Sequence, residues 1–280
     1  MPAATIMIQG TTSSAGKSVL CAGLCRLFHQ EGFRVAPFKS QNMSTESAIT
    51  ADGGEISVSQ AFQALACGIQ PSADMNPVLL KPLGDMTSEA ILAGKSVGVI
   101  HAAEYRYRHL GAALGCIERS YRRLAAEYDI VVIEGAGSPA EVNLKDRDIC
   151  NMRIARMADA PVLLVANIDP GGALAAIVGT LELLDADERD RVKGLVINKF
   201  RGDFSLLAPG LDFLEKKTGK PVLGVIPYID NLAIAEEDSL GGKRGISLGA
   251  ISTLDAECDR IAAAVRKAID IDELFGIMGL

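Results

Sequence analysis

The sequence predicts a doubly wound α/β domain with a mostly parallel sheet and a small insertion at the rim of the sheet. Six short apolar runs rich in β-branched residues alternate with helical stretches, and a polar cluster follows directly after each run. Strands buried on both faces have such continuous apolar sequences, and the helices between them indicate right-handed crossovers. The expected strands are Thr5–Gln9, Arg34–Phe38, Ile130–Glu134, Pro161–Ala166, Val192–Ile197 and Pro221–Ile226.

The remaining segments complete the expected domain. An amphipathic helix is expected from Lys17 to Glu31, and the run Ala90–Ile100, with Gly94-Lys95 at its centre, predicts a hairpin on the rim. A helix is expected over His101–Tyr128. An acidic, Gly-rich loop (Glu236–Gly245) then precedes a helix over Leu254–Ile269 and a short apolar end.

Composition favours small-molecule chemistry in the cytoplasm. The 280 residues carry a net charge of −7, and no basic run is longer than Arg122-Arg123, so nucleic acid is not an expected partner. Apolar runs stay below the roughly 18 residues needed to cross a bilayer, so no membrane partner is expected. Met1–Gln9 lacks the features of a secretory signal. The six cysteines form no C-x-x-C pair and are expected to be reduced core residues.

The polar clusters are expected to meet at one edge of the sheet. In open parallel sheets, ligands bind outside the carboxyl ends of the strands, where these clusters lie. The six clusters are Gly10–Ser18, Lys39–Asn42, Glu134–Ser138, Asn167–Gly172, Asn198–Asp203 and Pro227-Tyr228.

The first cluster, GTTSSAGKS, predicts a phosphate loop between a strand and a helix. Its backbone N–H groups would hold the β-phosphate of ATP, and Lys17 would neutralise the β- and γ-phosphate oxygens. Five residues, not four, separate Gly10 from Gly16, so the loop is longer than the common pattern. The alternative is a plain Gly/Ser turn. The expected nucleotide-binding residues are Gly10, Thr11, Thr12, Ser13, Ser14, Ala15, Gly16, Lys17, Ser18 and Val19.

Magnesium is the expected metal, because Mg²⁺ accompanies ATP and requires oxygen ligands. Ser18, Asp52 and Glu134 are the candidate ligands. Asp52 could instead be a turn-forming residue, and Glu134 could be a solvated acid at a strand end.

Three further residues are expected to contact ATP or the reacting group. Lys39 could bridge the γ-phosphate and a substrate carboxylate, which makes it a candidate catalytic residue, although a solvated loop lysine is the alternative. Asn198 could bind the adenine edge, with Pro227 near the base. An amide that caps a strand end is the alternative for Asn198.

Seven ordered strings resemble the ATP-binding domain of the cobyric acid synthase family over about residues 6–228. They are APFKSQNMS, TADGGEIS, MNPVLLKP, EGAGSPAEVNLKDRDICNM, NIDPGG, INKFRGD and GKPVLGVIPY. The lengthened loop is shared with dethiobiotin synthetase and cobyrinic acid a,c-diamide synthase, so the resemblance implies a dethiobiotin synthetase-like P-loop NTPase fold. Residues 1–280 are then expected to form one ATP-dependent synthetase domain, with a C-terminal loop and helices over 229–280.

The resemblance implies a late step of cobalamin biosynthesis. Side-chain carboxylates of adenosylcobyrinic acid a,c-diamide would be phosphorylated by ATP, and ammonia would displace the phosphate to give the amides of cobyric acid. Asp146 and Asp148 are implied as catalytic residues on the corrinoid side, with N-cap acids as the alternative. The implied substrate-binding residues are Lys39, Gln41, Asn42, Asn76, Lys81, Gly135 and Asp169.

Two departures from the family accompany this resemblance. Family members tend to have D-R-G-G where this chain has Asp169-Pro170-Gly171-Gly172, so a cation is missing from that loop. No glutamine amidotransferase domain is expected in the roughly 50 residues after the matched region, and the histidines at 29, 101 and 109 all precede the last cysteine. Three alternatives stay open: the sequence is a truncated piece of a longer enzyme, a separate glutaminase domain or subunit supplies ammonia, or free ammonia is used. A homodimer stays open.

Two other functions are carried forward as alternatives. The first is a dimeric ATPase switch of the ParA/MinD type, which needs a lysine early in the loop where this chain has Thr11 and Thr12. The second is an inactive nucleotide-binding remnant, which Pro170 and the missing glutaminase domain would suit.

Overall fold

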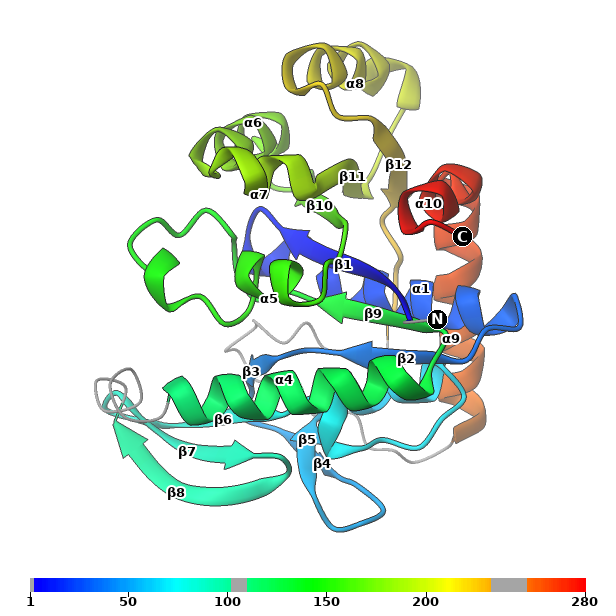
Figure 1. Ribbon diagram of the computed structural model, residues 1–280. Helices are drawn as coiled ribbons and strands as arrows, with labels where there is room; N and C mark the ends of the chain where they lie inside the picture. The colour runs from blue at the N-terminus through cyan, green and yellow to red at the C-terminus, as the bar shows by residue number, and fades with distance from the viewer. Residues whose placement is uncertain (1–2, 102–109, 233–250) are drawn as a thin grey trace.

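A six-stranded parallel sheet lies at the centre of the computed structural model, which describes residues 3–101, 110–232 and 251–280 (Figure 1). The strand order is β12-β11-β10-β1-β9-β2, and every neighbouring pair is parallel. All six predicted strands are therefore confirmed, although the fifth continues to Phe200. Their bounds are β1 (Ala4–Gly10), β2 (Val35–Phe38), β9 (Ile130–Glu134), β10 (Val162–Asn167), β11 (Val192–Phe200) and β12 (Val222–Pro227).

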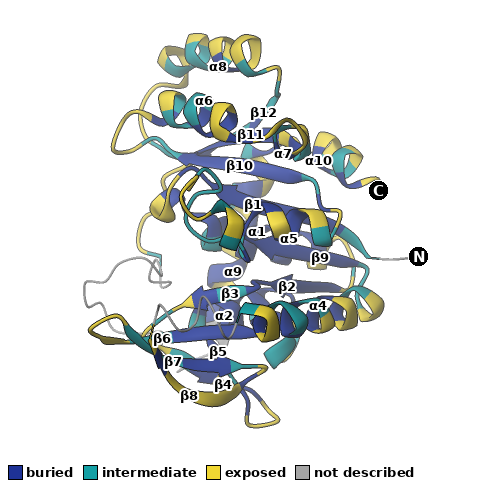
Figure 2. Cartoon of the chain, turned by 60° about the vertical axis from the view of Figure 1, so that its left-hand side comes forward, coloured by how far each residue is buried: buried dark blue, intermediate teal, exposed yellow. Residues whose placement is uncertain are grey.

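Helices cover both faces of this sheet. Successive side chains of a strand point to opposite faces, and because these side chains are apolar, each face must be covered. In β1, Ile6 and Ile8 lie in one buried cluster and Met7 lies in the other. Figure 2 shows the strands buried and the outer helix faces exposed. The cluster with Ile6 and Ile8 includes residues of α1 (Lys17–Gln30), α2 (Val58–Ala66), α9 (Ile251–Ala268) and α10 (Ile271–Met278). The cluster with Met7 includes residues of α4 (Leu110–Glu127), α5 (Met152–Met157), α6 (Ala173–Leu183) and α8 (Phe204–Thr218). A short α7 (Ala186–Arg191) precedes β11.

The rim insertion is larger than the predicted hairpin. The hairpin exists as β7 (Thr87–Leu92) and β8 (Lys95–His101), joined by a turn in which Ala93 and Gly94 have φ values of 48° and 77°. It belongs to a four-stranded sheet of order β3-β6-β7-β8, and a separate hairpin lies beside it. These additional strands are β3 (Gln41–Met43), β4 (Ser47–Ile49), β5 (Glu55–Ser57) and β6 (Val78–Gly84). They were missed because their apolar runs are too short to show a period.

One boundary differs from expectation, because His101 ends β8 and is not helical. The described part of the expected helix is α4 (Leu110–Glu127), and residues 102–109 lie outside the described residues. The expected loop Glu236–Gly245 also lies outside the described residues, whereas the helix after it is confirmed as α9. All six cysteines are free thiols, as expected. Among the described residues, no helix is both long and apolar enough to cross a membrane.

The last strand depends on a glycine where the C-terminal helices meet the sheet. A Cβ at Gly224 would lie 2.2 Å from the carbonyl oxygen of Ala268. We expect Gly224→Ala to lower the free energy of unfolding by about 1–3 kcal/mol, because backbone must move to admit the methyl group. Urea unfolding measures this. Gly276→Ala is the control, since a Cβ at that helical position has no neighbour within 4 Å. Equal unfolding midpoints for Gly224→Ala and the unsubstituted chain would contradict the close approach.

Candidate active site at the carboxyl edge of the sheet

Glu134, the last residue of β9, lies at the centre of a buried polar cluster. Its side chain is inaccessible to solvent, and its Oε1 accepts a hydrogen bond of 2.7 Å from Ser18 Oγ in the first turn of α1. The same oxygen forms an ion pair of 2.9 Å with Lys39 Nζ, just after β2. The structure therefore brings three predicted site residues from three elements into direct contact.

Two glutamines that sequence reasoning missed complete this cluster. Gln63 Nε2 donates to Glu134 Oε2 at 2.5 Å, and Gln60 Nε2 lies 3.5 Å from the same oxygen. Both side chains come from α2 and are fully buried. Their signal in the sequence was a pair of glutamines three residues apart in an otherwise apolar helix, VSQAFQALA, which places both amides on one face.

The predicted phosphate loop is a tight turn between β1 and α1. After β1 it makes a 3₁₀ turn over Ser13–Ala15, and Gly16 with φ 87° leads into α1. A Cβ at Gly16 would lie 2.2 Å from Asn198 Nδ2, so no larger residue fits there. Lys17 Nζ donates to the carbonyl oxygens of Thr12 and Ser13, each at 3.1 Å. The loop thus closes around the lysine ammonium group.

The loop after β9 is fastened to the phosphate loop. Lys17 Nζ donates to the carbonyl oxygen of Gly137 at 3.3 Å. Asn151 holds the same segment, because its Oδ1 accepts from Ala136 N at 3.2 Å and its Nδ2 donates to Ala136 O at 2.7 Å. A Cβ at Gly135 would lie 2.3 Å from Asn151 Oδ1. Gly135 therefore permits this close contact, and its predicted contact with substrate stays a prediction.

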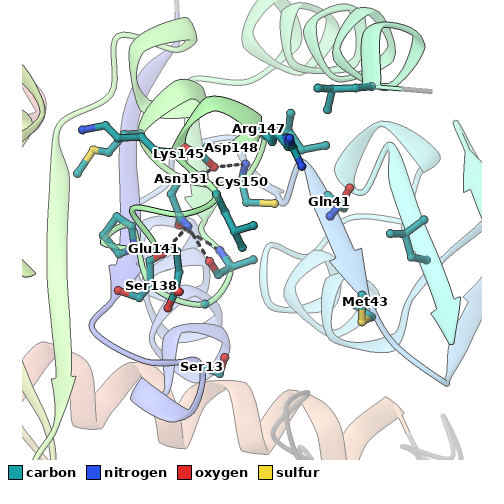
Figure 3. A pocket seen from close by; sticks show the side chains of 18 of the residues that line it. Ser13, Gln41, Met43, Ser138, Glu141, Lys145, Arg147, Asp148, Cys150 and Asn151 are labelled. Carbon is teal, nitrogen blue, oxygen red and sulfur yellow. Dashed lines mark hydrogen bonds between the residues drawn. The ribbon is translucent and has the colours of Figure 1, made fainter. Parts of the chain in front are cut away.

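A cavity of about 700 Å³ opens beside these loops (Figure 3). Thr11, Thr12 and Ser13 of the phosphate loop line one part of it. Figure 3 shows Gln41 and Met43 on β3 across the cavity from the segment that carries Asp148 and Asn151. Apolar walls come from the rim sheet and from the segment before α5, through Leu80, Ile100, Leu144 and Ile149.

Two predicted carboxylates belong to this segment but differ in their contacts. Asp148 lines the cavity, and its carboxylate accepts from the backbone N–H groups of Cys150, Asn151 and Arg153. These bonds fasten the turn before α5, whose N-cap position is occupied by Asn151 and not by Asp148 as the alternative supposed. Asp146 is exposed and lies 3.4 Å from Arg147 Nε. Arg147 lines the cavity together with Lys145, and neither of these basic residues was predicted.

The structure gives three other predicted residues structural contacts. Asn76 is 1% exposed, and its amide bonds only backbone groups, of Ser57, Lys39 and Val78. Asn76 thus bridges these segments, and its predicted substrate contact stays a prediction. Lys81 pairs with Glu55 on the neighbouring hairpin. Asn42, which is 4% exposed on β3, lies beside Gln41 in the sequence but is not in the described cavity lining.

Asp52 is not brought to the Glu134 cluster. It is exposed in the β4–β5 turn, where its Oδ1 accepts from Thr50 Oγ1 at 2.5 Å. This bond and the neighbouring backbone N–H of Gly54 lower the pKa of Asp52. The turn-forming alternative therefore accounts for its contacts, and a role in binding Mg²⁺ stays a prediction.

The residues predicted around the base also have partners within the protein. Asn198 Nδ2 donates to Ala15 O at 2.9 Å, so this amide braces the phosphate loop from β11. Pro227 is exposed at the end of β12. Asp169 lies 3.5 Å from Arg201 Nε, and the Arg201 guanidinium lies 3.4 Å from the centre of the Tyr228 ring. Arg201 thus supplies a positive charge next to the loop in which Pro170 stands.

The pair of oxygens formed by Ser18 and Glu134 fits Mg²⁺. A hydroxyl and a carboxylate 2.7 Å apart at the first turn of α1 are hard ligands of the kind that Mg²⁺ selects. Sulfur near the site does not compete, because burial and then the Glu134 charge raise the pKa of Cys21. Cys150 on the cavity wall has its pKa raised to about 12, chiefly by burial. Both cysteines are therefore neutral thiols at neutral pH.

The Lys39–Glu134 pair has an energetic consequence that unfolding can test. Lys39→Met leaves a buried carboxylate without its cation, and we expect a loss of about 3 kcal/mol or more in the free energy of unfolding. The double variant Lys39→Met/Glu134→Gln removes both charges and should recover much of that loss. Urea titrations of the single and double variants measure the difference. A single variant as stable as the double variant would contradict a tight ion pair.

Comparisons with known proteins place this fold and loop in a family. The family described as an AAA domain (AAA_26) matches residues 4–235. The cobyric acid synthase of Pelotomaculum thermopropionicum is 59% identical over 241 residues, which are 85% of this chain and 45% of the relative. That of Sorangium cellulosum is 60% identical over 87% of this chain and 47% of the relative. The chain spans about half the length of these curated relatives.

Solved structures are more distant. The signal recognition particle receptor FtsY from Elizabethkingia anophelis has 17% identity and a TM-score of 0.45, covering 92% of this chain and 65% of that chain. The MinC:MinD cell division protein complex of Aquifex aeolicus has 12% identity and a TM-score of 0.46, covering 95% of both chains. Likenesses at this level establish no shared function. The family match and the curated relatives confirm the resemblance seen in the sequence, and this chain belongs to the AAA domain family.

Proposed function

We propose that this chain is an ATP-dependent ligase of cobalamin biosynthesis that converts side-chain carboxylates of a corrinoid into amides through acyl phosphates. One observation carries the proposal. The cavity of about 700 Å³ is bounded by Thr11, Thr12 and Ser13 of the phosphate loop on one side and by Leu80 and Ile100 of the rim sheet on the other. A large, partly apolar substrate and a nucleotide phosphate can therefore meet in one space.

The cavity lining carries charges of both signs: the cations of Lys145 and Arg147 lie in the same wall as the acids Glu141, Asp148 and Glu188. Gln41 on β3 adds an amide for hydrogen bonding. Lys145, another lining residue, is paired with Asp185 at 2.6 Å and with Glu188 at 2.7 Å, and Arg147 Nε lies 3.4 Å from Asp146, so either cation would exchange a protein carboxylate for one of the substrate. Apolar walls would hold the ring system of a corrinoid while these groups orient its side chains.

ATP and Mg²⁺ would bind at the start of α1. The phosphate loop supplies backbone N–H groups and the positive end of the helix dipole, and Lys17 would exchange its carbonyl partners for phosphate oxygens. Ser18 and Glu134 would hold Mg²⁺, which supplies positive charge to the phosphates when bound. A corrinoid carboxylate oxygen would attack the γ-phosphorus, and ADP would leave.

Lys39 would stabilise the charge that gathers in this step. Its ammonium group is paired with Glu134 just after the carboxyl end of β2, and Gln41 on the cavity wall follows two residues later. There it would reduce the repulsion between a carboxylate and the γ-phosphate. The resulting acyl phosphate gives the carbonyl carbon a leaving group. Ammonia would then attack that carbon, and inorganic phosphate would leave to give the amide.

Ammonia would reach this site either as free ammonia or from a separate glutaminase domain or subunit. The cysteine on the cavity wall does not suit glutamine hydrolysis, because Cys150, with a pKa of about 12, stays protonated and a thiol attacks only as thiolate. Glutamine and ammonium can therefore be compared as nitrogen sources in the same assay.

The test is mass spectrometry of the corrinoid product. The chain incubated with ATP, Mg²⁺, ammonium and adenosylcobyrinic acid a,c-diamide should yield products in which carboxylates have become amides, with one phosphate released per amide. We expect Lys17→Ala to reduce the rate by at least about 100-fold, because the phosphates lose their closest cation. Lys216→Ala, at the exposed end of α8, is the matched control and should be unaffected. Phosphate release without any amide would contradict the proposal.

A further inference from the structure

Two uncharged side chains hold the carboxylate at the centre of the site from behind. Glu134 Oε1 faces Ser18 and Lys39, whereas its Oε2 faces α2, where Gln63 Nε2 lies at 2.5 Å and Gln60 Nε2 at 3.5 Å. The two oxygens of Glu134 thus have different partners. One is anchored by amides, and the other points toward the hydroxyl with which it would share Mg²⁺.

The two amides fix each other's orientation. Gln60 Nε2 donates to Gln63 Oε1 at 2.9 Å, which forces the nitrogen of Gln63 to face Glu134. The same nitrogen of Gln63 also lies 3.4 Å from the carbonyl oxygen of Ser18. Gln60 Oε1 is left buried without a hydrogen-bond partner among the described residues. A buried amide oxygen without a partner costs free energy. The Gln60 amide therefore keeps its nitrogen toward Gln63 and Glu134, although its own oxygen forms no hydrogen bond among the described residues.

The helix that carries these glutamines is held in place at its start. Ser57 caps α2 by accepting from Gln60 N, and Ser57 N donates to Asn76 Oδ1 at 3.1 Å. Asn76 Nδ2 in turn donates to the carbonyl oxygen of Lys39 at 3.1 Å. One chain of hydrogen bonds therefore links the backbone of Lys39 to the helix whose amides hold its ion-pair partner.

Neutral donors suit a carboxylate that must still attract a metal. Lys39 already offsets much of the negative charge of Glu134. A second cation behind the carboxylate would cancel the remaining attraction for Mg²⁺, whereas an amide N–H orients the carboxylate and leaves its charge in place.

We propose that Gln60 and Gln63 are positioning residues that hold Glu134 in the orientation that binds Mg²⁺. This inference rests on the proposed function, since it assumes that Mg²⁺ and ATP bind at this site. The glutamines would act through Glu134, whose Oε2 they contact.

The test measures Mg²⁺ binding directly. Mg²⁺ is titrated calorimetrically into the chain saturated with a non-hydrolysable ATP analogue, and binding of the same analogue is measured again in the presence of EDTA. Gln63→Met keeps the length of the side chain but removes the donor, and we expect the dissociation constant for Mg²⁺ to rise about 10- to 100-fold. Binding of the analogue in EDTA should be unchanged. Gln60→Met should have a smaller effect in the same direction, because its nitrogen is farther from Glu134.

Gln9→Met is the matched control. Gln9 is also a fully buried glutamine, but its amide nitrogen contacts the sulfur atoms of Met7 and Met152 at 3.4 and 3.7 Å rather than Glu134. The control should bind Mg²⁺ as the unsubstituted chain does.

Three results would overturn the inference. One is an unchanged Mg²⁺ affinity in Gln63→Met, or in Gln60→Met should Gln63→Met fail to fold. Another is an equal loss in Gln9→Met, which would indicate a general effect of changing a buried amide. A third is a parallel loss of analogue binding in EDTA, which would indicate damage to the phosphate loop. An unsubstituted chain that binds no nucleotide would instead reject the proposed function, and this inference with it.

Discussion

The buried ion pair between Lys39 and Glu134 is the constraint on which the candidate site depends. Both side chains are almost fully enclosed, with 5% and 0% of their surface exposed. A buried charge is costly without a partner, so the two strand ends that carry these residues must stay together. The sheet makes this contact available, because β9 pairs with β1 on one side and with β2 on the other. Glu134 lies in register with Ile8, two residues before the phosphate loop begins.

Strand order then determines what surrounds the pair. The chain leaves β1 through the phosphate loop, returns in β2 on one side of β9, and later adds β10 on the other side of β1. The carboxyl ends of these strands form one crevice, which is where ligands bind in doubly wound sheets. The rim sheet extends this crevice into a cavity, since β3 follows Lys39 after a single residue and places Gln41 on the wall.

Local signals were sufficient for much of this arrangement. The strands, the phosphate loop and the Ser18–Glu134–Lys39 convergence follow from apolar runs, a short motif and the rule for parallel sheets. The spacing of Gln60 and Gln63 places their amides on one helix face, but it does not indicate which residue they contact, because Glu134 lies 71 residues from Gln63. Asn76 and Asn198 were predicted to bind ligands because the sequence does not show which backbone groups their amides contact. The folded chain brings those backbone groups to them. Asp52 shows the same limit, since the sequence does not reveal where the β4–β5 turn points.

The most direct test of the central claim is a crystal structure with Mg²⁺ and a non-hydrolysable ATP analogue. The account predicts that Ser18 Oγ lies about 2.0–2.1 Å from Mg²⁺, that Glu134 binds the ion directly or through one water molecule, and that the terminal phosphate lies against Lys17 and Lys39. A triphosphate held elsewhere, or a metal ion that leaves the Ser18–Glu134 hydrogen bond intact, would contradict it.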